Sequence, residues 1–151
     1  MRLLSHCIFG LVSWGARKGI APERKSDSAA SARHTGIRGE TYAYWYLRRH
    51  GYTIVARNFR VTGLKGEIDL IGYDGEVLTF IEVKTRTSEG DLLALPEDAV
   101  TSDKRRFVAR IARQFLAEWR IPEARCRFDV VAIESHPGRS PLVRLHKGAF
   151  T

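Results

Sequence analysis

An acidic residue followed by a Glu-x-Lys triplet is the part of this sequence whose residue types could do chemistry. Asp69 lies in the run GEIDLI, and Glu82 and Lys84 lie in the run FIEVKTR. Two hard oxygen ligands can hold Mg²⁺ while coordination positions stay open for water and a phosphate oxygen. An ammonium group two residues beyond the second acid can orient the attacking water or neutralise charge on the phosphate. The spacing is the arrangement that a metal-dependent phosphodiesterase requires, with Asp69 and Glu82 as metal ligands and Lys84 as the catalytic lysine.

Two strands joined by a tight turn would carry these residues. The pair Asp74-Gly75 is a hairpin signal, because Gly accepts the positive φ of a tight turn and Asp tolerates it. The flanking residues are β-branched or apolar, so we predict one strand over Ile68–Gly72 and the next over Val77–Lys84. Both acids would then lie on one hairpin.

The alternation of side chains along a strand decides which of these groups share a face. Glu82 and Lys84 project together from one side of a mostly apolar strand. Asp69 stands between two apolar residues, so we expect a carboxylate near the hairpin interior that needs a metal ion or a lysine as its partner. The same pattern is also typical of a cross-strand ion pair on a solvated sheet face, and that alternative needs no metal.

Several short motifs in a fixed order extend this pattern over most of the chain. The runs RGETYAYWYLRRHGY and RNFR precede the hairpin, and Lys104 and the run RFDVVAI follow it. This set, from about Gly36 to Ile133, resembles the YraN-like family of small predicted endonucleases, which is similar to Holliday-junction resolvases. The resemblance implies an α/β fold with a restriction-endonuclease-like core, in which helices flank a mixed β-sheet. It does not name a substrate.

The resemblance also implies roles for two residues outside the hairpin. Glu40 matches the helix acid that approaches the metal site, which would make it a third catalytic and metal-binding carboxylate for Mg²⁺ or Mn²⁺. Its helix is predicted to open at Gly39-Glu40 and to run to about His50. A local alternative is therefore a favourable acid near the positive N-terminus of that helix. Lys104 matches a lysine that family members carry near the start of a later helix, and we expect it to face the scissile phosphate.

The remaining periodicities predict the elements around the hairpin. Gly51 would end the first helix, and the first strand would cover Tyr52–Asn58. A loop over Ser88–Ala99 would lead to a long helix, capped by Thr101 or Ser102 and stopped by Pro122. Its apolar stripe is predicted to be core: Phe107, Val108, Ile111, Ala112, Phe115, Leu116 and Trp119.

The C-terminal part of the sequence predicts one interior strand and one edge strand. Arg127–Ile133 carries apolar residues on both faces, which is typical of an interior strand, and Leu142–His146 would be an edge strand. Asp129 within the first of them is either a structural acid paired with a basic neighbour or a supporting group at the metal site. Helices and strands in this order predict an α/β domain of two or three layers.

The basic residues indicate a polyanionic partner. The net charge is +8 and the pI is about 9.9, and clustered Lys and Arg gain affinity by displacing counterions from phosphate. Such charges are most often solvated strand ends or helix faces, but near a metal–phosphate site they would hold a nucleic-acid backbone without reading its sequence. DNA is the expected partner, with branched DNA as one candidate substrate, and the preference for DNA over RNA rests on the resemblance. The candidate contacts are Arg57, Arg60 and Lys65 beside the hairpin and Lys104, Arg106 and Arg110 on the later helix.

Residues 1–35 are predicted to be a flexible basic arm ahead of a nuclease-like domain over residues 36–151. The arm holds six Lys and Arg against two acids, so it carries +4, half of the net charge, and it lacks core-forming periodicity. The apolar run Leu3–Trp14 weakly suggests a signal peptide. Its poor cleavage site favours instead an amphiphilic extension or a start codon placed too early.

Composition narrows the remaining options. No segment has the run of about twenty apolar residues that crosses a bilayer, so we expect a cytoplasmic protein without a membrane partner. Cys7 and Cys126 make neither a disulfide framework nor a zinc site. The two function classes that stay open are a metal-dependent DNA endonuclease and a non-catalytic nucleic-acid-binding accessory protein, with an RNase as a third alternative. A homodimer also stays open, as a resolvase that cuts two strands would form one.

Overall fold

The computed structural model describes Phe9, Ser13 and the ranges 28–87, 101–121, 126–135 and 139–150. Two long helices and five strands make up these ranges. In chain order they are α2 (Ser28–Arg49), β1 (Thr53–Phe59), β2 (Ile68–Asp74), β3 (Val77–Thr87), α3 (Ser102–Trp119), β4 (Cys126–Ser135) and β5 (Leu142–Phe150).

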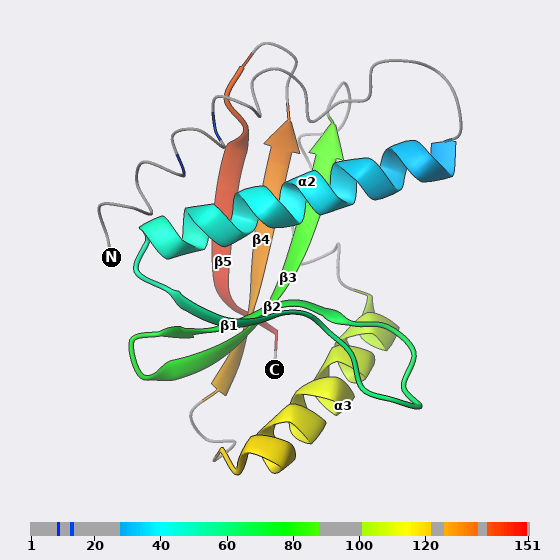
Figure 1. The fold of residues 1–151 in the computed structure, drawn as a ribbon, viewed down its shortest axis with the longest axis vertical. Helices are drawn as coiled ribbons and strands as arrows, with labels where there is room; N and C mark the ends of the chain where they lie inside the picture. The colour runs from blue at the N-terminus through cyan, green and yellow to red at the C-terminus, as the bar shows by residue number, and fades with distance from the viewer. Residues whose placement is uncertain are drawn as a thin grey trace.

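The strands form one mixed sheet in the order β1-β2-β3-β4-β5 (Figure 1). All neighbouring strands are antiparallel except β3 and β4, which run parallel from Leu78↔Cys126 to Thr87↔Ser135. Parallel neighbours need a crossover connection, and α3 lies within the segment that makes it. The prediction of an α/β fold with a mixed sheet is confirmed, and the arrangement is consistent with a restriction-endonuclease-like core.

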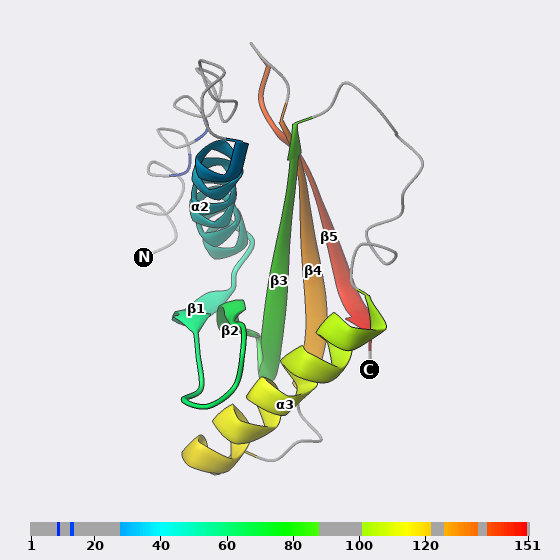
Figure 2. The ribbon, with the colours of Figure 1, turned by 90° about the vertical axis from the view of Figure 1, so that its right-hand side faces the viewer.

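The two helices cover opposite faces of the sheet, so the domain has three layers (Figure 2). On one face, α2 packs Ala43 and Leu47 against Ile81 of β3. On the other face, α3 packs Ile111 and Phe115 against the sheet. Burial of apolar surface on both faces of β3 explains why the site strand is the centre of the fold.

The first helix begins earlier than predicted, at Ser28 and not at Gly39-Glu40. Glycine disfavours helix interiors, which is why the sequence placed a boundary there. Gly39 nevertheless lies inside α2. This position must be glycine because a Cβ there would overlap Thr85 Oγ1 on β3. Glu40 therefore lies far beyond the first turn of α2, and the explanation of Glu40 as an acid near a helix N-terminus is wrong.

Two residues of the predicted arm, Phe9 and Ser13, contact α2. Phe9 is buried, and its ring lies 5.3 Å from the ring of Tyr42 and 6.2 Å from that of Tyr46. Ser13 Oγ donates a hydrogen bond to Tyr42 Oη at 3.4 Å. The chain is thus attached to α2 at these two residues, and residues 28–35 are helical. The rest of the arm lies outside the described residues, so its flexibility stays a prediction.

The hairpin turn differs from the prediction in one respect. Asp74 is the last residue of β2 and pairs with Val77, so the two turn residues are Gly75 and Glu76. Gly75 alone takes a positive φ, of 62°, which suits glycine at the first central position of a two-residue turn. Asp74 is used as an ion-pair partner for Arg127 instead.

Most of the other element assignments are confirmed with small shifts. Gly51 follows α2 with φ of 94°, and Thr101 caps α3 by accepting a hydrogen bond from Lys104 N. β4 lies inside the sheet and β5 at its edge, and both extend beyond their predicted C-terminal ends. Trp119 is an exception, because this last residue of α3 is 64% exposed and only stacks on Phe115.

The predicted loop Ser88–Ala99 and the helix stop at Pro122 lie outside the described residues. Within the described ranges, no helix is both long enough and apolar enough to span a membrane.

Candidate functional site

The site lies where β2 and β3 stop pairing. Their backbone pairs run from Asp74↔Val77 to Leu70↔Ile81 and end there, while β1 still pairs with β2 as far as Ile68. Asp69 and Glu82 are the next residues along the two strands, and both are buried, with 8% and 5% of their surfaces exposed. Asp69 Oδ2 accepts a hydrogen bond from Val83 N at 2.7 Å, which takes the place of a strand-to-strand bond. The fork between the strands therefore brings the two predicted acids together.

The surroundings of Asp69 disfavour its charge. Burial is the main cause that raises the pKa of this carboxyl from 3.8 to about 7, and the nearby Glu82 carboxylate raises it further. The Val83 N–H and the charge of Lys104 act in the opposite direction but do not balance these effects. A strongly raised pKa at a buried acid is typical of functional sites.

Two lysines hold one oxygen of Glu82. Lys84 Nζ lies 2.9 Å and Lys104 Nζ lies 3.3 Å from Glu82 Oε1. Both lysines are about one-third exposed, so their charges reach the surface. Glu82 Oε2 is buried and has no hydrogen-bond partner among the described residues. One oxygen of this carboxylate is thus satisfied by the protein, whereas the other is available to a ligand.

Glu40 approaches this site from α2. Contact between Gly39 and Thr85 brings α2 close to β3 just after Lys84. Burial raises the pKa of Glu40, and the charges of Glu67 and Glu82 raise it as well. Glu40 therefore interacts electrostatically with Asp69 and Glu82, and its role at the metal site stays a prediction.

Asn58, which no sequence pattern singled out, joins Glu40 to the hairpin. In the amide orientation that satisfies both partners, its nitrogen donates to Glu40 Oε2 at 3.0 Å and to the backbone oxygen of Asp69 at 3.3 Å. Asn58 has φ of 50°, a left-handed conformation that asparagine tolerates better than most residues. In the sequence, only the asparagine in the run RNFR pointed to this contact. A strand pattern does not show that a residue at the end of a strand will bond to a helix.

The loop between β1 and β2 places α3. Gly66 has φ of 96°, and a Cβ there would lie 2.6 Å from the ring of Phe107 on α3. This close approach holds the first turns of α3 near the start of β2. Lys104 consequently reaches Glu82 from the face opposite α2. Lys104 was expected to face the scissile phosphate more than the other basic residues of this helix, and that role stays a prediction. In the structure Lys104 is half-buried, whereas Arg106 and Arg110 are exposed.

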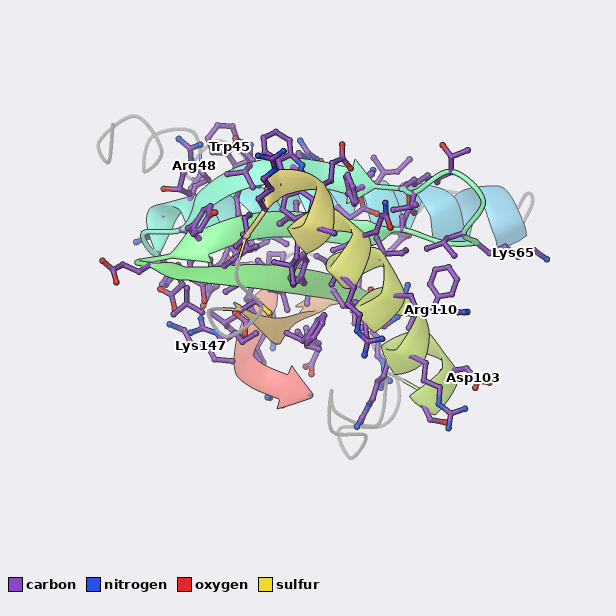
Figure 3. The ribbon with its side chains drawn as sticks, turned by 90° about the horizontal axis from the view of Figure 1, so that it is seen from below. Trp45, Arg48, Lys65, Asp103, Arg110 and Lys147 are labelled. Atoms are coloured by element: carbon purple, nitrogen blue, oxygen red, sulfur yellow. The ribbon has the colours of Figure 1, made fainter. Side chains whose placement is uncertain are left out.

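The basic residues predicted to contact a nucleic-acid backbone differ in exposure and in their partners within the protein. Lys65 and Arg110 are exposed and lie at the same end of the molecule in Figure 3. Arg60 is exposed but pairs with Glu67, with Nη2 to Oε2 at 2.7 Å. Arg57 lies with its guanidinium 4.9 Å from the centre of the Tyr44 ring. All six remain candidates for phosphate contacts, but three of them, Arg57, Arg60 and Lys104, already have partners in the protein.

The donor set suits a hard divalent cation, although the present arrangement is not a finished metal site. Carboxylate oxygens are the ligands that Mg²⁺ and Mn²⁺ prefer. The unpartnered Oε2 of Glu82 and the raised pKa of Asp69 are both features that a cation would relieve. Within the described ranges, however, no group of three His, Cys, Asp or Glu side chains is close enough together to hold a metal ion. Asp69 and Glu82 are therefore the two carboxylates that best suit a divalent cation, and Glu40 lies beside them.

Comparison with known proteins assigns the chain to a family. The model of the Uncharacterised protein family UPF0102 matches residues 39–133. A UPF0102 protein of Koribacter versatilis is 46% identical over 116 residues, which cover 77% of this chain and 78% of that protein. A UPF0102 protein of Symbiobacterium thermophilum is 44% identical over 79% of this chain and 98% of its own length. The matched segment contains every residue of the site just described, and the chain belongs to the UPF0102 family.

Proposed function

We propose that this protein is a metal-dependent nuclease that hydrolyses phosphodiester bonds in DNA. One observation carries the proposal: Asp69 and Glu82 are both buried at the fork between β2 and β3, with Lys84 Nζ 2.9 Å from Glu82 Oε1. Burying two like charges side by side is unfavourable for stability. Such an arrangement is typical of sites that a ligand completes.

The chain's own residues would divide the work as follows. Asp69 and Glu82 would hold Mg²⁺ or Mn²⁺, which when bound polarises a phosphate oxygen and makes water a better nucleophile. Lys84 would orient the attacking water or neutralise charge on the phosphate, because its ammonium group is already beside Glu82 and partly exposed. Lys104 would neutralise the phosphate from the α3 side. Glu40, positioned by Asn58, would complete the acidic site.

The basic surface supports a nucleic-acid substrate. Lys65 and Arg110 are exposed at one end of the molecule, and the chain has a net charge of +8. Exposed cations near an acidic centre can hold the sugar-phosphate backbone on both sides of the bond to be cut. Branched DNA is one candidate within this class.

Incubation with defined substrates tests the proposal. Purified protein would be mixed with linear duplex, branched and single-stranded DNA in Mg²⁺ or Mn²⁺, and products would be separated on denaturing gels. We expect cleavage by the wild type, none by Glu82→Gln, and wild-type cleavage by Glu118→Gln, a matched change at an exposed position of α3. Cleavage that survives Glu82→Gln would overturn the proposed site.

A non-catalytic nucleic-acid-binding protein is the second candidate, and one observation favours it. Lys84 and Lys104 already neutralise one oxygen of Glu82, so the carboxylate has internal partners. Under this alternative the wild type binds DNA but binds no Mn²⁺ at millimolar concentration. Calorimetric titration with Mn²⁺ separates the two candidates.

A further inference from the structure

A second surface begins one helical turn from Glu40. Tyr44 follows Glu40 by four residues and Arg48 follows Tyr44 by four, so the three side chains form one row along α2. One turn of a helix rises by about 5 to 6 Å. The row therefore leads away from the acidic site in steps that suit successive groups of a bound polymer.

Aromatic and guanidinium groups come together along this row. The Tyr44 ring meets the Trp45 ring edge to face, with centroids 4.9 Å apart and planes at 87°. Arg57 of β1 lies 4.9 Å from the centre of the Tyr44 ring, and Arg48 donates to Tyr44 Oη at 3.5 Å. We call Tyr44, Trp45, Arg48 and Arg57 the aromatic–arginine cluster.

The cluster lies at the surface and is linked to the acidic site through Asn58. Arg57 is exposed, and Arg48, Tyr44 and Trp45 are half-buried. Asn58, which follows Arg57 on β1, donates a hydrogen bond to Glu40 Oε2 at 3.0 Å. Figure 3 shows Trp45 and Arg48 at the end of the molecule away from Lys65 and Arg110. The cluster is therefore a different surface from the basic residues near α3.

We infer that the aromatic–arginine cluster binds an unpaired strand of nucleic acid next to the phosphate that the acidic site addresses. Aromatic rings and guanidinium planes stack on exposed bases, which a paired duplex keeps inside its helix. The exposed Arg57 and the half-buried Arg48 beside the rings supply charge for the backbone phosphates. The inference deepens the proposed function and rests on it for the neighbouring phosphate, because it assigns the substrate class of a strand that is single-stranded on one side of the cut.

A purely structural role makes a different prediction. If the cluster only packs the end of α2 against β1, removal of Trp45 lowers the melting temperature and weakens binding to all nucleic acids alike. If it is a stacking surface, removal of Trp45 weakens binding to unpaired strands selectively.

Binding in EDTA tests the inference apart from catalysis. Fluorescence anisotropy would compare a labelled oligothymidylate with a duplex of the same length. We expect Trp45→Ala to weaken binding to the single strand by about 5-fold to 100-fold, with less than about a 2-fold change for the duplex. Trp119→Ala is the matched control, since Trp119 is an exposed tryptophan on α3, and it should change neither affinity.

Two further measurements keep the test decisive. A stacked base quenches tryptophan fluorescence, so Trp45→Phe, which preserves packing, should remove the quenching that oligothymidylate causes, while Trp119→Phe should retain it. An oligouridylate of equal length tells whether the strand is DNA or RNA, and selective binding of either supports the cluster. Equal losses on single strand and duplex, or no loss in Trp45→Ala, would overturn the inference. Absence of cleavage in Mg²⁺ would instead count against the proposed function alone.

Discussion

Two groups of carboxylates in this molecule differ in how far the protein supplies them with partners of opposite charge. On the interior strand β4, Asp129 is fully buried and accepts hydrogen bonds from Tyr52 Oη, Arg127 Nε and Gly148 N. The same Arg127 also bonds Asp74. Hydrogen bonds from Arg127 and then Lys147 hold the pKa of Asp74 below its ordinary value. Every charge in this group has a partner of opposite sign.

The fork between β2 and β3 shows the contrary arrangement. Asp69 has one backbone donor, and burial raises its pKa. Glu82 pairs with lysines through one oxygen and leaves the other without a partner among the described residues. The comparison teaches that this fold can satisfy a buried acid completely, as it does for Asp129. The unsatisfied acids at the fork are therefore a property of that place and not of the sheet as a whole.

The largest effect on stability is expected at Asp129 and its partner Arg127. Arg127→Ala leaves the buried Asp129 carboxylate without its main partner, and such losses cost about 3 to 5 kcal/mol of unfolding free energy. Urea unfolding followed by circular dichroism measures it. Arg144→Ala is the control, because its pair with Glu134 is partly exposed and should contribute less than about 1 kcal/mol. Similar losses in both variants would contradict the contrast drawn above.

The opposite sign is expected at Asp69. Because its pKa rises from 3.8 in the unfolded chain to about 7 in the native state, the native carboxylate costs stability increasingly as the pH rises between these values. Without metal, Asp69→Asn should therefore stabilise the protein by up to about 4 kcal/mol above pH 7, and by little near pH 4. Asparagine can still accept the Val83 N–H.

Urea unfolding in EDTA at both pH values measures this effect. Asp103→Asn is the control, since Asp103 is exposed in the first turn of α3 and labelled in Figure 3. Its loss should cost a few tenths of a kcal/mol through the helix dipole. Equal stabilisation by Asp69→Asn at the two pH values would show that the carboxylate is not strained by burial.

Metal binding should depend on Asp69 and Glu82 at the fork and not on Asp74 or Asp129. Asp69→Asn is expected to weaken Mn²⁺ binding at least about tenfold, or about 1.4 kcal/mol, because a cation loses one of its two buried carboxylates. Asp74→Asn should leave Mn²⁺ affinity unchanged, since Asp74 is paired with Arg127 and Lys147. Calorimetric titration measures both. If Asp69→Asn binds Mn²⁺ as tightly as the wild type, these residues are not the metal site.

The smallest change is expected in DNA affinity when one lysine from each group is replaced. Lys84→Ala should abolish cleavage and yet change DNA affinity by less than about threefold, because several cations share phosphate neutralisation. Lys147→Ala should leave both cleavage and affinity close to the wild type, since Lys147 serves Asp74. In the wild type, DNA affinity should fall steeply between about 50 and 200 mM salt. An affinity that is insensitive to salt would contradict a basic DNA-facing surface.

Much of the fold followed from local patterns, with errors where a tertiary contact replaced a local rule. The strands around the hairpin and the cap at Thr101 were placed within a few residues. The helix boundary at Gly39 was wrong because close packing on Thr85 requires a glycine inside α2. Trp119 was wrong because helical spacing shows which face a residue occupies and not where the helix leaves the sheet.

The sequence itself determined that one hairpin carries Asp69, Glu82 and Lys84, because strand alternation is a local property. Only the tertiary structure decided how they are completed. The divergence of β2 from β3, the reach of Lys104 from α3 and the bridge of Asn58 to Glu40 join elements distant in the chain. Such distances depend on how helices pack on the two faces of the sheet, and no periodicity within a single element encodes them.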